Sequence, residues 1–213
     1  MYAPTLGILA AAQQPLTAEE MVTWARLPVD ADALADLLQG EWRAFIDVQT
    51  DANPQQLRAS GQAVYRFYHA SLLRLMRGET EAEAIAGLDT QGKRFVARLK
   101  DAKTRAHKQI VAELRGRCDG EWVRLVADDY GRRYLTTHLS VTQPDEMFRL
   151  VAMDDAWAKA RNRREETYVG YLGDLALAQH RSAGMGWGSR CGARCSRASC
   201  TAWQAIFRRN CWG

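Results

Sequence analysis

Residues 91–115 read QGKRFVARLKDAKTRAHKQIVAELR, and this stretch decides the expected fold. On a helix that turns about 100° per residue, its apolar side chains gather in one sector, about 180° to 300° from Lys93. The members of this stripe are Phe95, Val96, Leu99, Ala102, Ala106, Ile110 and Leu114. The stretch therefore predicts a long helix whose apolar stripe faces the core.

The prolines lie outside a long central region of the chain. They stand at positions 4, 15, 28, 54 and 144, so none lies between Pro54 and Pro144. Proline is incompatible with a helix interior, so such a gap is typical of long helices. Neither an alternating strand pattern nor a repeat of fixed period is visible. We expect an all-α fold, a helical bundle or array of about six to seven helices.

Start and stop signals place the individual helices. Thr17 with Glu20 forms a capping-box pattern, and Pro28 ends the first helix. Asp30 or Asp32 begins the second helix, which continues to Ile46. The later helices are expected at 54–77, 81–88 and 91–115, then around 122–135 and from Pro144 to about 175.

The chain is expected to comprise an N-terminal segment (1–15), a helical domain (16–180) and an irregular tail (181–213). The apolar run Leu6–Ala12 lacks a basic flank and is far shorter than the roughly 20 residues of a membrane span. It is either a packing segment or a frayed end. No other apolar stretch approaches spanning length, so we expect a cytoplasmic protein without a membrane partner.

The tail has an unusual composition. Residues 181–213 carry six Arg and no Asp, Glu or Lys. We expect the last roughly 30 residues to be a passenger, read out of frame or past a displaced stop; the alternative is an Arg-rich arm that binds a polyanion. Four cysteines lie here without the paired short spacings of common zinc sites, which favours no organised chemistry over disulfides or a metal site. They are Cys191, Cys195, Cys200 and Cys211.

Positive charge is concentrated in two places. The net charge of +4 hides segments of −6 over residues 1–91, +7 over 92–117, −3 over 118–180 and +6 over 181–213. The body of the protein is therefore slightly acidic around one basic helix. Such asymmetry says more about partners than the net charge does.

The side of helix 91–115 opposite its apolar stripe is cationic. Six Lys or Arg side chains fall between about 340° and 140° on the helix, with Asp101 the only acid near them. A cationic face of this length can follow the phosphates of duplex DNA and release their counterions. We call this surface the basic face; it consists of Gln91, Lys93, Arg94, Arg98, Lys100, Arg105 and Lys108.

Residues 77–99 resemble the helix-turn-helix of transcription regulators. In that motif a small residue packs early in the first helix and a β-branched residue anchors the recognition helix, and Ala86, Val96 and Leu99 stand at fitting offsets. Thr90 occupies the turn position where the motif usually has Gly. The resemblance implies that Gln91, Lys93, Arg94 and Arg98 meet the major groove, while Arg105 and Lys108 hold phosphates.

No constellation typical of catalysis is visible. The four histidines lack the i, i+4 spacing of a helical metal pair, and nothing local supports Cys118 with His138 as nucleophile and base. We expect a non-enzymatic, helix-turn-helix-like DNA-binding regulatory protein with no metal or cofactor. The alternative is a helical protein–protein adaptor or inhibitor, in which the basic face is solvated or meets an acidic protein partner.

Overall fold

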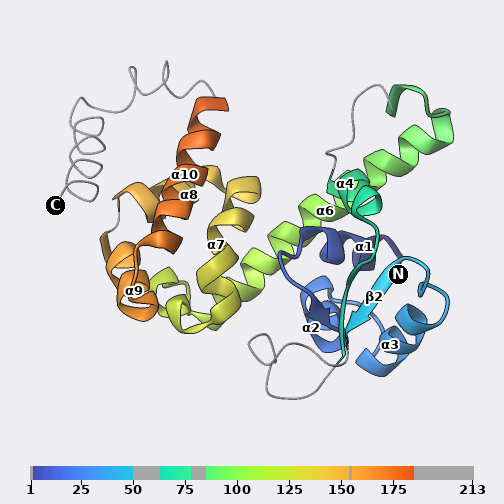
Figure 1. Ribbon diagram of the computed structural model, residues 1–213, viewed down its shortest axis with the longest axis horizontal. Helices are drawn as coiled ribbons and strands as arrows, with labels where there is room; N and C mark the ends of the chain where they lie inside the picture. Colours follow the sequence, from blue (N-terminus) through green and yellow to red (C-terminus); the bar gives the residue numbers. More distant parts are fainter. Residues whose placement is uncertain (1, 50–62, 78–84, 154, 185–213) are drawn as a thin grey trace. The chain divides into compact units, whose positions relative to one another are not determined.

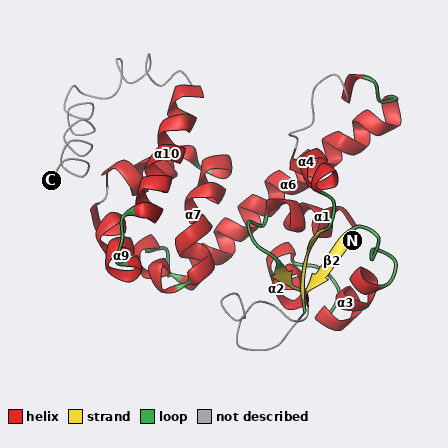
Figure 2. Ribbon diagram, viewed as in Figure 1, coloured by secondary structure: helices red, strands yellow, loops and turns green. Residues whose placement is uncertain are grey.

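The structure is a computed structural model that describes residues 2–49, 63–77, 85–153 and 155–184. The chain divides into two compact units, Met1–Glu113 and Leu114–Gly213. Helices dominate the described residues of both units, as Figure 2 shows. The expected helical fold class is confirmed, with one small sheet as the exception. Within the described ranges, no helix is long and apolar enough to cross a membrane.

Two helices of the first unit begin at the caps that the sequence predicts. Thr17 caps one helix through the predicted capping box: its Oγ1 accepts from the Glu20 amide at 3.2 Å, and Glu20 Oε2 accepts from the Thr17 amide at 2.9 Å. Asp30 caps the next, with Oδ1 2.7 Å from the Ala33 amide. The helices are α1 (Tyr2–Ala11), α2 (Ala18–Ala25), α3 (Ala31–Gln39), α4 (Ala70–Arg77) and α6 (Thr90–Arg117), and Figure 1 shows their course.

The first unit also contains a three-stranded antiparallel sheet, which the sequence analysis did not predict. Its strands are β1 (Leu16–Thr17), β2 (Ile46–Gln49) and β3 (Val64–Phe67), in the order β1-β3-β2. The predicted helix to Ile46 is wrong at its end, because α3 stops at Gln39. The predicted helix over 54–77 is wrong at β3, while its residues 54–62 lie outside the described residues.

The core of the first unit gathers side chains from its helices and its sheet. Among the fully buried ones are Ile8, Leu16, Met21, Trp24, Leu34, Leu38, Tyr65, Leu99 and Ile110. A Cβ placed on Gly7 would lie 2.7 Å from the Ala102 carbonyl oxygen, so α1 and α6 approach each other very closely there. The N-terminal apolar run is therefore a packing segment rather than a frayed end.

The second unit is built from short helical pieces. After a 3₁₀ turn, Trp122–Ala127, follow α7 (Asp129–Thr142), α8 (Pro144–Phe148), a π-helical turn, Arg149–Met153, α9 (Asp155–Glu165) and α10 (Val169–Gly184). Pro144 opens α8 as predicted. The single helix expected from Pro144 to about 175 is wrong, since the π-helical turn interrupts it and Glu166 ends α9 with a left-handed φ of 53°.

Several predictions lie outside the described residues. These include the tail beyond Gly184 with its four cysteines, and residues 81–84 of the short helix expected at 81–88. Ile85 and Ala86, the next residues of that helix, are helical. The assignment of residues 1–15, 16–180 and 181–213 to separate segments stays a prediction.

Candidate nucleic-acid interface

The helix that carries the basic face begins at a side-chain cap. Asp89 Oδ1 accepts a hydrogen bond from the Gly92 amide at 2.6 Å, and the Asp89 carbonyl accepts from the Lys93 amide at 3.0 Å. An aspartate in this position satisfies an amide that the first helical turn leaves without an intrahelical partner. From this cap α6 continues to Arg117, two residues beyond its expected end.

The apolar stripe of α6 is buried, with one exception. Val96, Leu99, Ala102, Ala106, Ile110 and Leu114 are all buried, as the helical periodicity predicts. Phe95 is 52% exposed, so its assignment to the core-facing stripe is wrong. Phe95 lies at about 200° on the helix, one edge of the stripe, and the core ends before it reaches that edge.

All seven residues of the basic face are exposed. The six cations follow α6 from Lys93 to Lys108, and these 15 residue steps correspond to about 22 Å of helix. These side chains therefore share one solvent-facing side of a helix, as the sequence predicts. Lys103, which lies outside the basic face, is half-buried.

Among the described residues, the acidic side chains that form ion pairs do so with cations other than those of the basic face. In the part of the chain that the structure describes, no ion pair within 4.0 Å joins a side chain of the basic face to Asp or Glu. Asp101, exposed among them, forms none in that part either. By contrast, Arg115 is 2.7 Å from Glu146, and Arg117 is 3.1 Å from Asp128. Within the described ranges, the charge of the basic face is therefore not neutralised by an ion pair.

The helix-turn-helix resemblance is only partly visible. Val96 and Leu99 are buried, as the anchors of a recognition helix should be. Ala86 is exposed, so its expected packing role is wrong. Residues 78–84, which hold most of the motif's first helix, lie outside the described residues.

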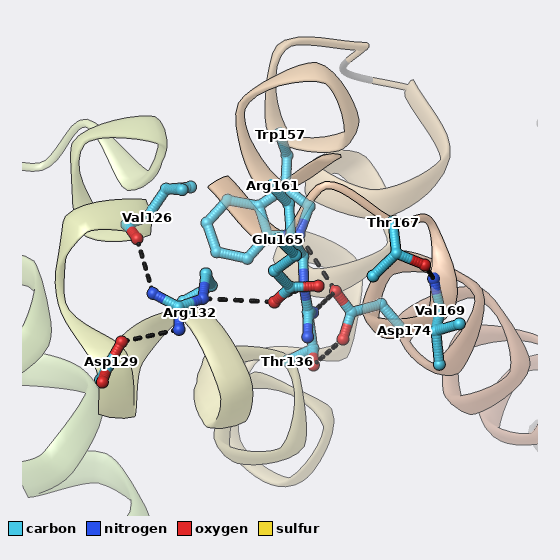
Figure 3. Close-up of polar contacts among 10 residues, drawn as sticks. All are labelled: Val126, Asp129, Arg132, Thr136, Trp157, Arg161, Glu165, Thr167, Val169 and Asp174. Atoms are coloured by element: carbon cyan, nitrogen blue, oxygen red, sulfur yellow. Dashed lines mark hydrogen bonds and ion pairs between the residues drawn. The ribbon is translucent and has the colours of Figure 1, made fainter. Parts of the chain in front are cut away.

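A buried charged cluster in the second unit has no counterpart among the sequence predictions. Its centre is Asp174, whose carboxylate accepts from Thr136 Oγ1 at 2.7 Å and Trp157 Nε1 at 3.1 Å and pairs with Arg161 (Figure 3). The side chains of Asp174 and Arg161 are each only 6% exposed. Burial raises the pKa of the Asp174 carboxyl, and the neighbouring Arg161 charge opposes that rise.

Glu165 extends this cluster to a second arginine. Its Oε1 accepts from Arg161 Nε at 3.0 Å and from Arg132 Nε at 3.2 Å. Arg132 also donates to the Val126 carbonyl at 3.1 Å and to Asp129 at 2.6 Å, which lowers the pKa of Asp129. Arg132 and Arg161 thus join α7, α9 and α10 through Glu165 and Asp174. We read the cluster as structural rather than as a site of chemistry.

Cys118 and His138, which were considered as a nucleophile and its base, interact with different groups. Cys118 is buried, burial raises the pKa of its thiol, and its Sγ lies 3.5 Å from the Arg115 carbonyl. His138 Nε2 is instead 2.9 Å from the Tyr130 hydroxyl. Within the described ranges, no group of three or more His, Cys, Asp or Glu side chains could hold a metal ion.

Comparison with protein-family models, with curated proteins and with solved structures finds no match. The basic face is therefore assessed on its own geometry and charge.

Proposed function

We propose that the protein binds nucleic acid through the basic face of α6 and acts as a non-enzymatic regulatory protein. One observation carries the proposal: six cations lie exposed along about 22 Å of a single helix, and none is ion-paired with Asp or Glu among the described residues. Unneutralised cations in a row are the requirement for tracking a phosphate backbone.

Different turns of α6 contact different parts of the nucleic acid. Lys100, Arg105 and Lys108 lie on the later turns and contact phosphates, because Lys and Arg bind phosphate without regard to sequence. Gln91 and Arg94 lie on the first turns, where side chains able to form paired hydrogen bonds with base edges are concentrated. The phosphate contacts of the later turns then provide most of the affinity, and the base contacts of the first turns provide any base preference.

Charge reversal tests this function. Arg94→Glu with Arg98→Glu should weaken binding to a labelled oligonucleotide at least tenfold at moderate salt, because two cations beside the bound strand become anions that repel its phosphates. The matched control is Arg163→Glu with Arg164→Glu, which changes the net charge equally at exposed positions of α9. Fluorescence anisotropy over a salt series measures both. Equal affinities for the two double variants would refute the proposal.

A protein–protein adaptor is the second candidate, and one observation favours it. Tyr168, Val169 and Leu172 are 50%, 72% and 42% exposed at the beginning of α10, an apolar group that water solvates poorly. On this alternative Val169→Asp with Leu172→Asp abolishes binding of a protein partner, while the Arg94→Glu, Arg98→Glu variant retains it. An affinity purification from nuclease-treated lysate compares the two variants directly.

A further inference from the structure

One aromatic side chain stands exposed among the cations of the basic face. Phe95 is 52% exposed, although helical periodicity places it beside the buried Val96 and Leu99. Around the axis of α6, Arg98, one turn later, lies about 60° from Phe95, and Arg94, directly before it, lies about 100° away. A large exposed apolar ring loses the free energy that burial would provide, so such a ring is often part of a binding site.

The ring lines an open depression. This depression measures about 760 Å³, and its wall includes Gln91, Arg94, Phe95 and Arg98. Asp89 also contributes to the wall, where its carboxylate already accepts from the Gly92 amide. The depression thus combines one aromatic ring, two guanidinium groups and one amide, which supply a stacking surface and hydrogen-bond donors.

We infer that this depression binds an unpaired nucleobase stacked on Phe95, so that the ligand of the basic face is single-stranded nucleic acid. This inference rests on the proposed function and makes it more specific. In a duplex both faces of each base are covered by neighbouring bases, whereas a single strand leaves them free to stack on an aromatic ring. Aromatic platforms beside cationic grooves are the usual means of binding single strands.

The charges around the ring select this ligand over an apolar partner. Arg94 and Arg98 are exposed at the depression, and Lys93, Lys100 and Arg105 continue the positive charge along α6. A base stacked on Phe95 therefore leaves its flanking phosphates beside cations, and each guanidinium can also stack on a neighbouring base. A purely apolar ligand would leave these charges without complementary groups.

The test uses the full chain with a labelled 15-residue single-stranded thymidylate and a duplex of equal length. Phe95→Ala should weaken single-strand binding about tenfold to a hundredfold, which is the usual contribution of one stacked base. The salt dependence of binding should not change, because no cation is removed. Phe95→Trp should retain the affinity, and Tyr168→Ala, which removes an exposed aromatic ring elsewhere, should leave it unchanged.

The outcomes separate this inference from the proposed function. If charge reversal at Arg94 and Arg98 weakens binding but Phe95→Ala does not, nucleic-acid binding stands and the stacking site is refuted. The stacking site is also refuted if Phe95→Ala weakens duplex and single-strand binding equally, or if the duplex binds more tightly. If charge reversal weakens neither ligand, the proposed function itself fails. Circular dichroism of each variant verifies its fold.

Discussion

Asp174 connects three helices of the second unit. Its carboxylate joins Thr136 on α7, Trp157 and Arg161 on α9, and its own helix α10. Asp174→Asn removes the negative charge and leaves the Arg161 guanidinium buried with less compensation. We expect a loss of about 3–5 kcal/mol in the free energy of unfolding, the usual result of breaking a buried pair. Urea unfolding followed by circular dichroism measures it.

Asp129→Asn provides the control for that measurement. Asp129 also pairs with an arginine of the cluster, but its side chain is 72% exposed and its partner Arg132 keeps Glu165. An exposed pair contributes at most about 1 kcal/mol, so this variant should remain nearly as stable as the wild type. Equal losses for the two variants would show that the buried cluster does not stabilise the unit as described.

Tyr171 gives the second unit a distinct response to alkali. Burial, and secondly the negative charges of Asp155 and Asp174, raise the pKa of its phenol to about 12. The unfolded chain releases this proton near pH 10. Because the pKa of Tyr171 is higher in the folded state than in the unfolded state, its neutral phenol contributes to the free energy of unfolding. This contribution is complete below pH 10 and is lost as the pH rises from 10 to 12.

Tyr171→Phe should therefore remove one component of alkaline unfolding. The wild type should lose about 2 kcal/mol more than the variant between pH 9 and pH 11.5, from the difference in the two pKa values. At pH 9 the variant should be the less stable, because it lacks the hydrogen bond from the Tyr171 hydroxyl to the Val151 carbonyl. Urea titrations at both pH values measure this. Parallel losses in the two proteins would contradict the assigned pKa.

Single residues were predictable from sequence where the signal was local. The capping box of Thr17 and Glu20 needs only four consecutive residues, and it is confirmed. Phe95 was wrongly predicted to be buried. Helical periodicity gives the direction in which a side chain points, but it does not show whether other residues cover that side chain. The Asp174 cluster was missed because charged residues are ordinarily expected in water. Arg161 follows the fully buried Trp157 by one helical turn, and that spacing was the available signal.

At the scale of elements, the packing of α1 on α6 rests on a glycine. Gly7→Ala would place a Cβ 2.7 Å from the Ala102 carbonyl oxygen, a backbone atom that cannot turn aside. We expect α1 to shift and the free energy of unfolding to fall by about 1–3 kcal/mol, as in other overpacked cores. Thermal or urea unfolding measures the loss.

Gly116→Ala is the matched control for this substitution. Gly116 also lies on a helix, near the end of α6, and a Cβ there would meet nothing within 4 Å. Alanine favours helix over glycine, so the variant should be unchanged or more stable by up to about 1 kcal/mol. A Gly7→Ala protein as stable as the Gly116→Ala protein would mean that α1 and α6 are not in close contact.

The small sheet was not predictable from local sequence. Residues 64–67 read VYRF, and four residues fit either a helix or a strand. What makes β3 a strand is its pairing: Tyr65 lies opposite Leu16 on β1 and Val48 on β2, both distant in sequence. Helix α6, by contrast, was predicted almost to its ends, because 28 residues contain many repeats of the helical period. For these two elements, the length of the periodic pattern decided whether the prediction succeeded.

At the scale of the whole molecule, the distribution of charge matters more than its sum. Segments on either side of the basic helix are acidic, yet the described acids pair with cations outside the basic face, such as Arg115 with Glu146 and Arg66 with Asp47. The sequence predicted the seven positions of the candidate interface because helical periodicity places the Lys and Arg side chains together, opposite the apolar stripe. Their exposure agrees with that choice, while the nucleic-acid role remains a proposal. The stacking role of Phe95 emerged only from its exposure.

The salt dependence of binding tests the central claim most directly. A full-length variant with Gln at Lys93, Arg94, Arg98, Lys100, Arg105 and Lys108 is compared with the wild type on the single-stranded thymidylate. Each cation that contacts a phosphate should contribute roughly 0.7 to the slope of log Kobs against log salt. The slope should therefore be shallower in the variant by about 2 if Lys100, Arg105 and Lys108 alone contact phosphates, and by about 4 if all six cations do. A difference below about 1 would show that these cations do not hold the nucleic acid, and it would contradict the account.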